Sequence, residues 1–386
     1  MDFSLNEDQR AFADAARQFA EERLAPNAAE WDEKHIFPKD VLKEAGEMGF
    51  LSLYVPEEQG GLGLPRLDAS IVFEQLSMGC TSTTAFMTIH NMVSWMIASF
   101  GTDDVKQAFC PSLVTGEMLG SYCLTEPNAG SDAASLTTSA VLQGEHYVIN
   151  GAKAFISGAG DTDVLVVMAR TSATANKAQG VSAFVVPANA PGVSYGRREP
   201  KMGWNSQPTR SVTFDDVRVP VSYRLGEEGE GFKFAMKGLD GGRLNIASCS
   251  LGTAQQAINN AKQYVAERRQ FGQSLSQFQS VQFKLADMVT ELVAARQLVR
   301  YAAFKLDNGD TDATAYCAMA KRFATDVGFK VCDEALQLYG GYGYIKEYPM
   351  ERHFRDVRVH QILEGTNEIM RLIISRRVLA EGAELL

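Results

Sequence analysis

Apolar residues recur every three or four positions through the first third of the chain, which is the spacing of one face of a helix. The first such stretch follows Ser4-Leu5-Asn6-Glu7, which fits a capping box, and it ends at Pro26. Glycine-rich loop signals separate the later stretches. We therefore expect further helices over residues 38–50, 67–79, 82–100 and 102–115.

The pattern changes near residue 120. Short runs of β-branched and aromatic residues, bounded by Gly, Pro, Asp and Asn, predict strands over 146–149, 152–157, 164–168, 181–186 and 211–214. Asn150-Gly151 lies between the first two runs, and this dipeptide favours a two-residue hairpin turn. The polar residues 171–180 predict an exposed loop between strands. This region is expected to form a compact β-domain.

Helical spacing returns after the glycine-rich residues 226–231 and continues to the end of the chain. It predicts helices over 232–267, 276–307 and 311–339, and a fourth that starts near Thr366. Long helices joined by short loops indicate an antiparallel bundle. The predicted fold class is α+β, with an N-terminal α-helical domain at 1–120, a middle β-barrel or β-sandwich domain at 121–228 and a C-terminal four-helix bundle at 229–386.

Composition narrows the classes of function. Of 386 residues, 37 are basic and 47 acidic, and the net charge of −10 argues against nucleic-acid binding, which needs Lys and Arg to neutralise phosphates. No apolar run reaches the ~18 residues of a membrane span. The six cysteines are scattered without a C-x-x-C pair and the five histidines are dispersed, so neither a disulfide framework nor a metal site is expected.

Targeting and nucleotide-binding signals are also missing from the sequence. The first residues lack the basic and apolar regions of a secretory signal. We expect a bacterial cytoplasmic protein, or a mitochondrial matrix protein whose transit peptide has been removed. The glycine-rich loops spell neither G-x-G-x-x-G nor a Walker A motif, and no G-x-S-x-G elbow occurs. A Rossmann dinucleotide site and serine hydrolase chemistry therefore have no support.

Three segments carry residues suited to chemistry. Glu364 follows two apolar residues and precedes a glycine, so its carboxylate is expected in a loop with partly apolar surroundings. Burial there raises the pKa of a carboxylate toward that of a general base, although a surface glutamate explains the local pattern as well. Residues 122–132 either bring backbone N–H groups close to a ligand or form a plain interdomain loop. Arg268 and Arg269 end a helix, where they either complement its dipole or meet a phosphate.

Motifs in these segments, in this order, resemble those of the acyl-CoA dehydrogenase family over essentially the whole chain. They are T-E-P-x-x-G-S-D at 125–132, N-G-x-K-x-x-I-S at 150–157, R-x-x-F-G at 268–272, the segment 337–344, Arg355-Asp356 and E-G-T-N-E at 364–368. The resemblance implies the three-domain fold of that family, with FAD bound between the β-domain and the bundle. It implies oxidation of an acyl-CoA to its 2,3-enoyl form, with electrons passed to electron-transferring flavoprotein. It also implies a homotetramer, a dimer of dimers in which FAD is shared between subunits.

The resemblance assigns the catalytic base to Glu364, which would remove the α-proton while the β-hydrogen leaves as hydride to the flavin. The backbone N–H of Glu364 and a ribityl hydroxyl of FAD would stabilise the thioester oxygen, as an oxyanion hole does. Some branches of the family carry the base on the long helix instead. Here that position is Gly242, which cannot act as a base.

The resemblance also assigns the other site residues. Contacts with CoA or the acyl group are implied for Ser131, Asp240, Arg243, Leu363, Gly365 and Arg376. Contacts with FAD are implied for Tyr122, Leu124, Thr125, Ser131, Phe155, Ile156, Ser157, Arg268, Phe271, Gln337, Gly341, Thr366 and Glu368.

Leu363 stands before the base where straight-chain relatives carry Tyr, which implies room for a branch at the α-carbon. We therefore expect a short 2-methyl-branched substrate, isobutyryl-CoA first. A place in valine breakdown is implied by the resemblance alone. Residues 84–92, with Phe86, Met87 and Met92, are the candidate pocket floor unless these side chains are plain core. The alternatives are butyryl- or 2-methylbutyryl-CoA as substrate, a flavin oxidase or monooxygenase of the same fold, and a catalytically inactive scaffold.

Overall fold

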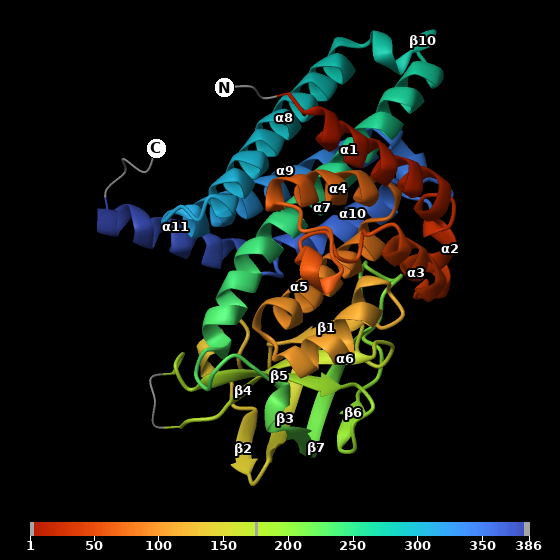
Figure 1. Ribbon diagram of the computed structural model, residues 1–386. Helices are drawn as coiled ribbons and strands as arrows, with labels where there is room; N and C mark the ends of the chain where they lie inside the picture. The colour runs from red at the N-terminus through yellow and green to blue at the C-terminus, as the bar shows by residue number, and fades with distance from the viewer. Residues whose placement is uncertain (1–3, 174–176, 382–386) are drawn as a thin grey trace.

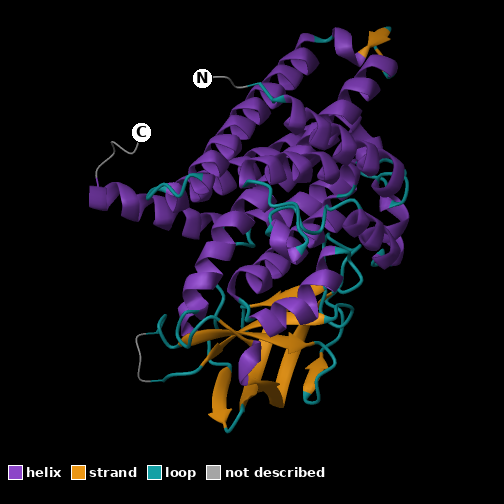
Figure 2. Cartoon of the chain, viewed as in Figure 1, coloured by secondary structure: helices purple, strands orange, loops and turns teal. Residues whose placement is uncertain are grey.

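The computed structural model describes residues 4–173 and 177–381. Its chain passes from helices to a sheet and back to helices, and the sheet lies at one end of the molecule (Figures 1 and 2). Three residues of the predicted loop 171–180, residues 174–176, lie outside the described part of the chain.

The N-terminal part is helical, as the periodicity predicts. The capping box of the first helix lies two residues later than expected: Gln9 N donates to Asn6 Oδ1 at 2.8 Å and Asn6 N donates to Gln9 Oε1 at 3.1 Å. A π-helical turn, Ala20–Leu24, extends this helix. The helices are α1 (Glu7–Phe19), α2 (Ala28–Lys34), α3 (Lys39–Glu47), α4 (Arg66–Gly79), α5 (Thr81–Phe100) and α6 (Asp103–Val114).

The middle part is one mixed sheet with the strand order β6-β7-β3-β2-β4-β5-β8, and β1 pairs in parallel with β4. The two ends of this order, β6 and β8, are not paired in the described sheet, so the barrel part of the prediction does not apply. The strands are β1 (Gly120–Cys123), β2 (Ser139–Gln143), β3 (His146–Ser157), β4 (Val164–Arg170), β5 (Val181–Pro187), β6 (Val193–Tyr195), β7 (Thr209–Pro220) and β8 (Arg224–Leu225).

The halves of this sheet enclose a common core, which confirms the sandwich interpretation. Leu165 and Phe184 from β4 and β5 share one apolar cluster with Tyr147 and Val217 from β3 and β7. The opposite face of β4 and β5, including Val166, packs against α5, α6 and the start of the first C-terminal helix. Because β4 is covered on both faces, its sequence is a continuous apolar run rather than an alternating one.

The predicted hairpin at Asn150-Gly151 is wrong. Residues 146–157 form one continuous strand, and the turn lies earlier, where Gln143 pairs with His146. Asn150 instead marks an irregularity in the pairing of β3 with β7. Its Nδ2 donates to Asp216 Oδ1 at 2.9 Å and its Oδ1 accepts from Asp216 N at 2.8 Å. This cross-strand pair accommodates the extra residue of a bulge, which the dipeptide alone could not distinguish from a turn.

The C-terminal part is the predicted bundle. Helices α7, α8 and α9 pack against one another, α11 packs on α9, and α4 of the N-terminal part packs on α7. A further helix before the Glu364 loop was not predicted. The helices are α7 (Gly231–Glu267), α8 (Gln279–Asp307), α9 (Ala313–Tyr339), α10 (Met350–Arg358) and α11 (Asn367–Glu381), with two short paired strands, β9 (Arg269–Gln270) and β10 (Gln273–Ser274).

Candidate active site

Glu364 lies in the loop between α10 and α11, with its carboxylate turned toward α7. A Cβ atom added at Gly242 of α7 would lie 2.5 Å from Glu364 Oε2, so a larger residue there would require the carboxylate to move. The backbone of Glu364 is left-handed, with φ of 55°, and Gly365 follows with φ of 89°. A left-handed glutamate is uncommon and is kept only where the surrounding structure holds it.

Glu364 has the electrostatic properties of a base. The residue as a whole is partly exposed, but its Oε2 atom is buried and has no hydrogen-bond partner among the described residues. Burial raises the pKa of Glu364 from 4.5 to about 7, against the opposing charges of Arg243 and Lys321. The carboxyl group therefore titrates near neutrality, as a general base should.

Asp240 and Arg243 flank Gly242 on α7, as expected. Arg243 Nη1 donates to Asp240 Oδ1 at 2.6 Å, and Thr314 Oγ1 donates to Asp240 Oδ2 at 2.7 Å. Burial raises the pKa of Asp240, and the Arg243 charge opposes this shift. Arg243 is 5% exposed and its Nε has no partner within the described chain. The charged Arg243 side chain is thus held near Glu364, and its Nε remains available to donate to a ligand.

Tyr122 of β1 approaches the same carboxylate from the β-domain. Burial, and then the Glu364 charge, raise the pKa of the Tyr122 phenol well above its ordinary value. Its hydroxyl is buried and has no partner among the residues described. Two neighbouring buried polar atoms without partners, this hydroxyl and Glu364 Oε2, are what a site completed by a bound molecule leaves behind.

Phe155, Thr125 and Ser157 lie where β3 passes the loop after β1. Phe155 is 72% exposed and has a left-handed backbone, with φ of 58°. Thr125 O accepts from Ala154 N at 2.8 Å, and Ser157 O accepts from Ser121 Oγ at 2.7 Å. An exposed aromatic ring is thereby held beside hydrogen-bonded backbone.

The loop after β1 is fixed by a buried ion pair. Lys153 Nζ donates to Glu126 Oε1 at 2.9 Å and to Leu124 O at 3.0 Å, and both charged side chains are nearly inaccessible. Ser131, further along this loop, is exposed. Ile156 points into the core of the sheet, so only its backbone is available to a ligand. The sequence analysis did not predict that Lys153 and Glu126 form this ion pair.

The residues Arg268, Phe271, Gln337 and Gly341 lie far from Glu364. Arg268, Gln337 and Gly341 line a cavity of about 450 Å³ at the opposite end of α7 from the sheet. Phe271 is 93% exposed beside it. Arg268 follows α7, 26 residues after Gly242, and at 1.5 Å per residue this is roughly 39 Å away. One chain therefore does not bring the two groups of expected FAD contacts together.

The remaining expected contacts lie on or near α11. Thr366 caps this helix by accepting a hydrogen bond from Ile369 N at 3.3 Å. Glu368 is exposed in its first turn, and Arg376 is exposed nine residues after the helix begins, roughly 14 Å along its axis. Arg376, which the resemblance assigned to substrate binding, therefore lies away from Glu364.

Leu363 packs in a small apolar cluster with Ala85, Trp204 and Ile246. Met92 faces α7 one turn before Gly242, because a Cβ at Gly238 would lie 3.2 Å from Met92 Sδ. Phe86 and Met87 are fully buried among the N-terminal helices instead. Of the candidate pocket floor, Met92 therefore faces the neighbourhood of the base, and the other two side chains are core.

The described residues hold no cluster of three or more potential metal ligands, and none of their helices is long and apolar enough to cross a bilayer. All six cysteines are buried and unpaired with one another.

Comparison with known proteins agrees with this architecture. Three family models match: acyl-CoA dehydrogenase N-terminal domain at residues 6–117, middle domain at 121–217 and C-terminal domain at 229–379. The mitochondrial isobutyryl-CoA dehydrogenase of Bos taurus is 53% identical over 98% of this chain and 90% of its own. The chain belongs to the acyl-CoA dehydrogenase family, whose members are flavin-dependent oxidoreductases that use FAD.

Two solved structures are similar over nearly the whole chain. The butyryl-CoA dehydrogenase of Megasphaera elsdenii has a TM-score of 0.94 and 40% identity, covering 98% of this chain and all of that one. A structure described as the electron transferring flavoprotein of Acidaminococcus fermentans has a TM-score of 0.96 and 42% identity, covering 99% of this chain and all of that one.

The residues present fit FAD. The exposed Phe155 ring beside the bonded backbone of Thr125 and Ser157 offers a surface for a flat ring system. The buried Tyr122 hydroxyl without a partner offers a polar contact next to it. Of these groups, the Tyr122 phenol lies near Glu364, whose charge raises the pKa of Tyr122.

Proposed function

We propose that this protein oxidises a short α-branched acyl-CoA, isobutyryl-CoA in the first place, to the 2,3-enoyl thioester methacrylyl-CoA. The observation that carries the proposal is Glu364, whose buried Oε2 faces Gly242 with no hydrogen-bond partner in the described chain. Similarity to an isobutyryl-CoA dehydrogenase supports the branched substrate. Similarity to a butyryl-CoA dehydrogenase supports the short straight-chain alternative.

In the proposed reaction, the Glu364 carboxylate takes the α-proton of the thioester. A pKa of about 7 leaves the group largely ionised just above neutrality and still basic enough to take a proton. The backbone N–H of Glu364 donates to the thioester oxygen, where negative charge develops. The bound FAD supplies the acceptor for the β-hydride, and a carbon–carbon double bond remains in the product. Tyr122, Thr125, Phe155 and Ser157 would hold the cofactor.

We propose that Leu363 forms the wall beside the α-carbon. Leu363 directly precedes Glu364, and its packing against Trp204 and Ile246 holds it in place. An aliphatic side chain there leaves more room than an aromatic one, and a pocket difference of one methylene is worth about 1–3 kcal/mol of discrimination.

We propose a homotetramer in which FAD is shared between neighbouring copies. The separation of roughly 39 Å along α7 between Gly242 and Arg268 supports this, because one cofactor cannot contact both ends of that helix in one chain. Arg268, Phe271, Gln337 and Gly341 of a second copy would then complete the site. Sedimentation of the FAD-loaded protein tests the assembly, and a monomer that retains FAD would contradict it.

We propose electron-transferring flavoprotein as the electron acceptor. The similar structure described by that name supports the proposal. Substrate-reduced enzyme should reoxidise slowly in air and quickly on addition of electron-transferring flavoprotein. Rapid reoxidation by air alone would instead favour an oxidase. The mitochondrial relative supports a matrix location if the protein is eukaryotic, and a bacterial cytoplasm is the alternative.

Anaerobic flavin bleaching tests the reaction itself. The purified holoenzyme is mixed with isobutyryl-, butyryl-, 2-methylbutyryl-, isovaleryl- or octanoyl-CoA, and Glu364→Gln serves as the variant without a base. Fastest bleaching with isobutyryl-CoA, lost in Glu364→Gln, is the expected result. Fastest bleaching with butyryl- or 2-methylbutyryl-CoA would assign that acyl group as the substrate and leave the proposed reaction unchanged. Bleaching of Glu364→Gln at the wild-type rate would remove Glu364 from the role of base.

A further inference from the structure

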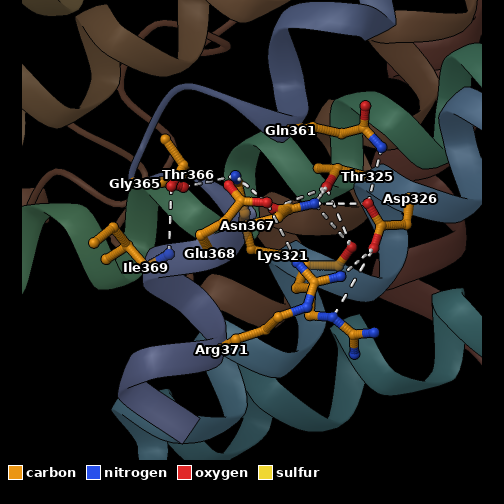
Figure 3. A network of polar contacts seen from close by, with 11 residues as sticks. Lys321, Thr325, Asp326, Gln361, Gly365, Thr366, Asn367, Glu368, Ile369 and Arg371 are labelled. Carbon is orange, nitrogen blue, oxygen red and sulfur yellow. Dashed lines mark hydrogen bonds and ion pairs between the residues drawn. The ribbon is translucent and has the colours of Figure 1, made fainter. Parts of the chain in front are cut away.

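Lys321 of α9 is a buried charge that the proposed reaction does not use. Its side chain is fully inaccessible, and its Nζ donates to Gly365 O at 2.8 Å and to Asn367 Oδ1 at 2.9 Å (Figure 3). Burying an ammonium group is costly unless hydrogen bonds or opposite charges compensate. Gly365 belongs to the loop that carries Glu364, and Asn367 is the first residue of α11, where this loop ends.

The same loop is tied to α9 at its two ends. Asn367 is 3% exposed, and its Nδ2 donates to Asp326 Oδ1 at 2.8 Å and to Thr325 Oγ1 at 3.0 Å. Gln361 Nε2 donates to the same Asp326 Oδ1 at 2.8 Å. Asp326 therefore anchors residues 361 and 367, while Lys321 holds the carbonyl between them (Figure 3).

The loop needs these anchors because its backbone is unusual at the base. Glu364 and Gly365 are consecutive left-handed residues, and glutamate enters this region at a cost. Such a conformation persists where the contacts around it leave no alternative. The Lys321 hydrogen bond to Gly365 O acts on the peptide group that joins Gly365 to Thr366, one residue after Glu364.

We propose that Lys321 is the positioning residue of the base: its ammonium group fixes the Gly365 carbonyl and Asn367 so that the Glu364 carboxylate faces Gly242, and its charge favours the ionised carboxylate. The proposal rests on the proposed function, in which Glu364 removes the α-proton.

The charges around the base agree with this role. Glu364 is faced by Arg243 of α7, by Lys321 of α9, by Tyr122 of β1 and by Tyr54 of the loop before α4. Arg243 and Lys321 both lower its pKa against the larger effect of burial. Around Lys321 itself, burial lowers its pKa to about 8, and Glu364, Asp326 and Glu368 oppose that shift while Arg243 reinforces it. Lys321 thus still carries its proton at neutral pH.

The test is the pH dependence of turnover in Lys321→Met holoenzyme. Methionine keeps an unbranched side chain, one atom shorter, and removes the charge and both hydrogen bonds. Because the Lys321 charge lowers the pKa of Glu364, its loss should move the acid limb of the pH profile of kcat upward by about one pH unit. The change in kcat at pH 7 should then be at least fivefold, with a smaller change in KM.

Lys201→Met is the matched control. Lys201 is also largely withdrawn from solvent and also donates to a carbonyl, Gln207 O, and to a hydroxyl, Thr209 Oγ1, both at 2.8 Å. It lies in the loop before β7. Its replacement should lower thermal stability and leave the acid limb in place.

Two further variants separate position from charge. Lys321→Gln retains a donor without charge, so it should show the shifted acid limb with a smaller loss of kcat, and it replaces Lys321→Met if that variant does not fold. Lys321→Arg should return the acid limb toward the wild-type position even where its bulk lowers kcat. An acid limb at the wild-type pH in either neutral variant overturns the proposal. Wild-type turnover that survives in Glu364→Gln would instead refute the proposed function, whatever Lys321 does.

Discussion

Replacing Glu364 by glutamine should stabilise the folded protein, and increasingly so as the pH rises. Burial raises the pKa of Glu364 from 4.5 to about 7. The folded state therefore keeps a proton between these values that the unfolded state has already released. Stability present at low pH is lost as the pH rises toward 7, with a total of about 3 kcal/mol at 1.36 kcal/mol per pH unit. A glutamine cannot ionise, so the variant avoids this loss.

Thermal unfolding of FAD-loaded, substrate-free protein measures the effect. Between pH 5.5 and 8.5 the variant should gain about 2 kcal/mol on the wild type, because part of the loss has already occurred at pH 5.5. An unfolding entropy of about 2.1 cal/mol/K per residue over 386 residues converts this to a growing Tm difference of roughly 2–3 °C. Glu58→Gln, at an exposed surface position, serves as the control and should show a Tm difference that does not change with pH.

The result that refutes the reasoning is a Tm difference between Glu364→Gln and wild type that is constant across this pH range. The carboxylate would then be solvated in the folded protein, and the case for a buried base would fail with it. A difference that shrinks as the pH rises would mean that Arg243 and Lys321 stabilise the ionised group more than burial destabilises it.

Two other substitutions test the geometry. Gly242→Ala should lower kcat at least tenfold while the flavin absorbance per protomer stays unchanged, because the added Cβ would lie 2.5 Å from Glu364 Oε2 and displace it; unchanged turnover would show that the carboxylate points elsewhere. Arg355→Met should destabilise the protein by about 2–4 kcal/mol in urea unfolding, because partly buried Arg355 donates to Asp32 Oδ2 at 2.6 Å and to Glu351 Oε1 at 2.8 Å. Hydrogen exchange in α2 should rise in that variant, and an unaltered exchange pattern would contradict the role of this ion pair in docking α2.

Local patterns predicted most of the helices and the strands β3, β4, β5 and β7, but not β1, β2, β6 and β8. The apolar runs at 164–168 and 181–186 lie within β4 and β5, and the helical periodicity at 232–267 corresponds to α7. The same local reasoning failed at Asn150-Gly151, since a bulge and a turn draw on the same residues. It also missed α2 and α10, whose seven and nine residues are too few for a clear periodic signal.

The α–β–α order and the Glu364 segment could be predicted from local patterns, because periodicity and turn chemistry are properties of neighbouring residues. Only the packing of distant segments places Glu364 against Gly242, which precedes it by 122 positions. The same packing places Lys321 against Gly365, in the loop that carries Glu364. A glycine within a helix and a lysine on an apolar helix face carry no local sign of either contact. Burial and the charges brought near by packing set the pKa of a carboxylate, so the chemistry of Glu364 emerges only when α7, α9 and β1 meet around it.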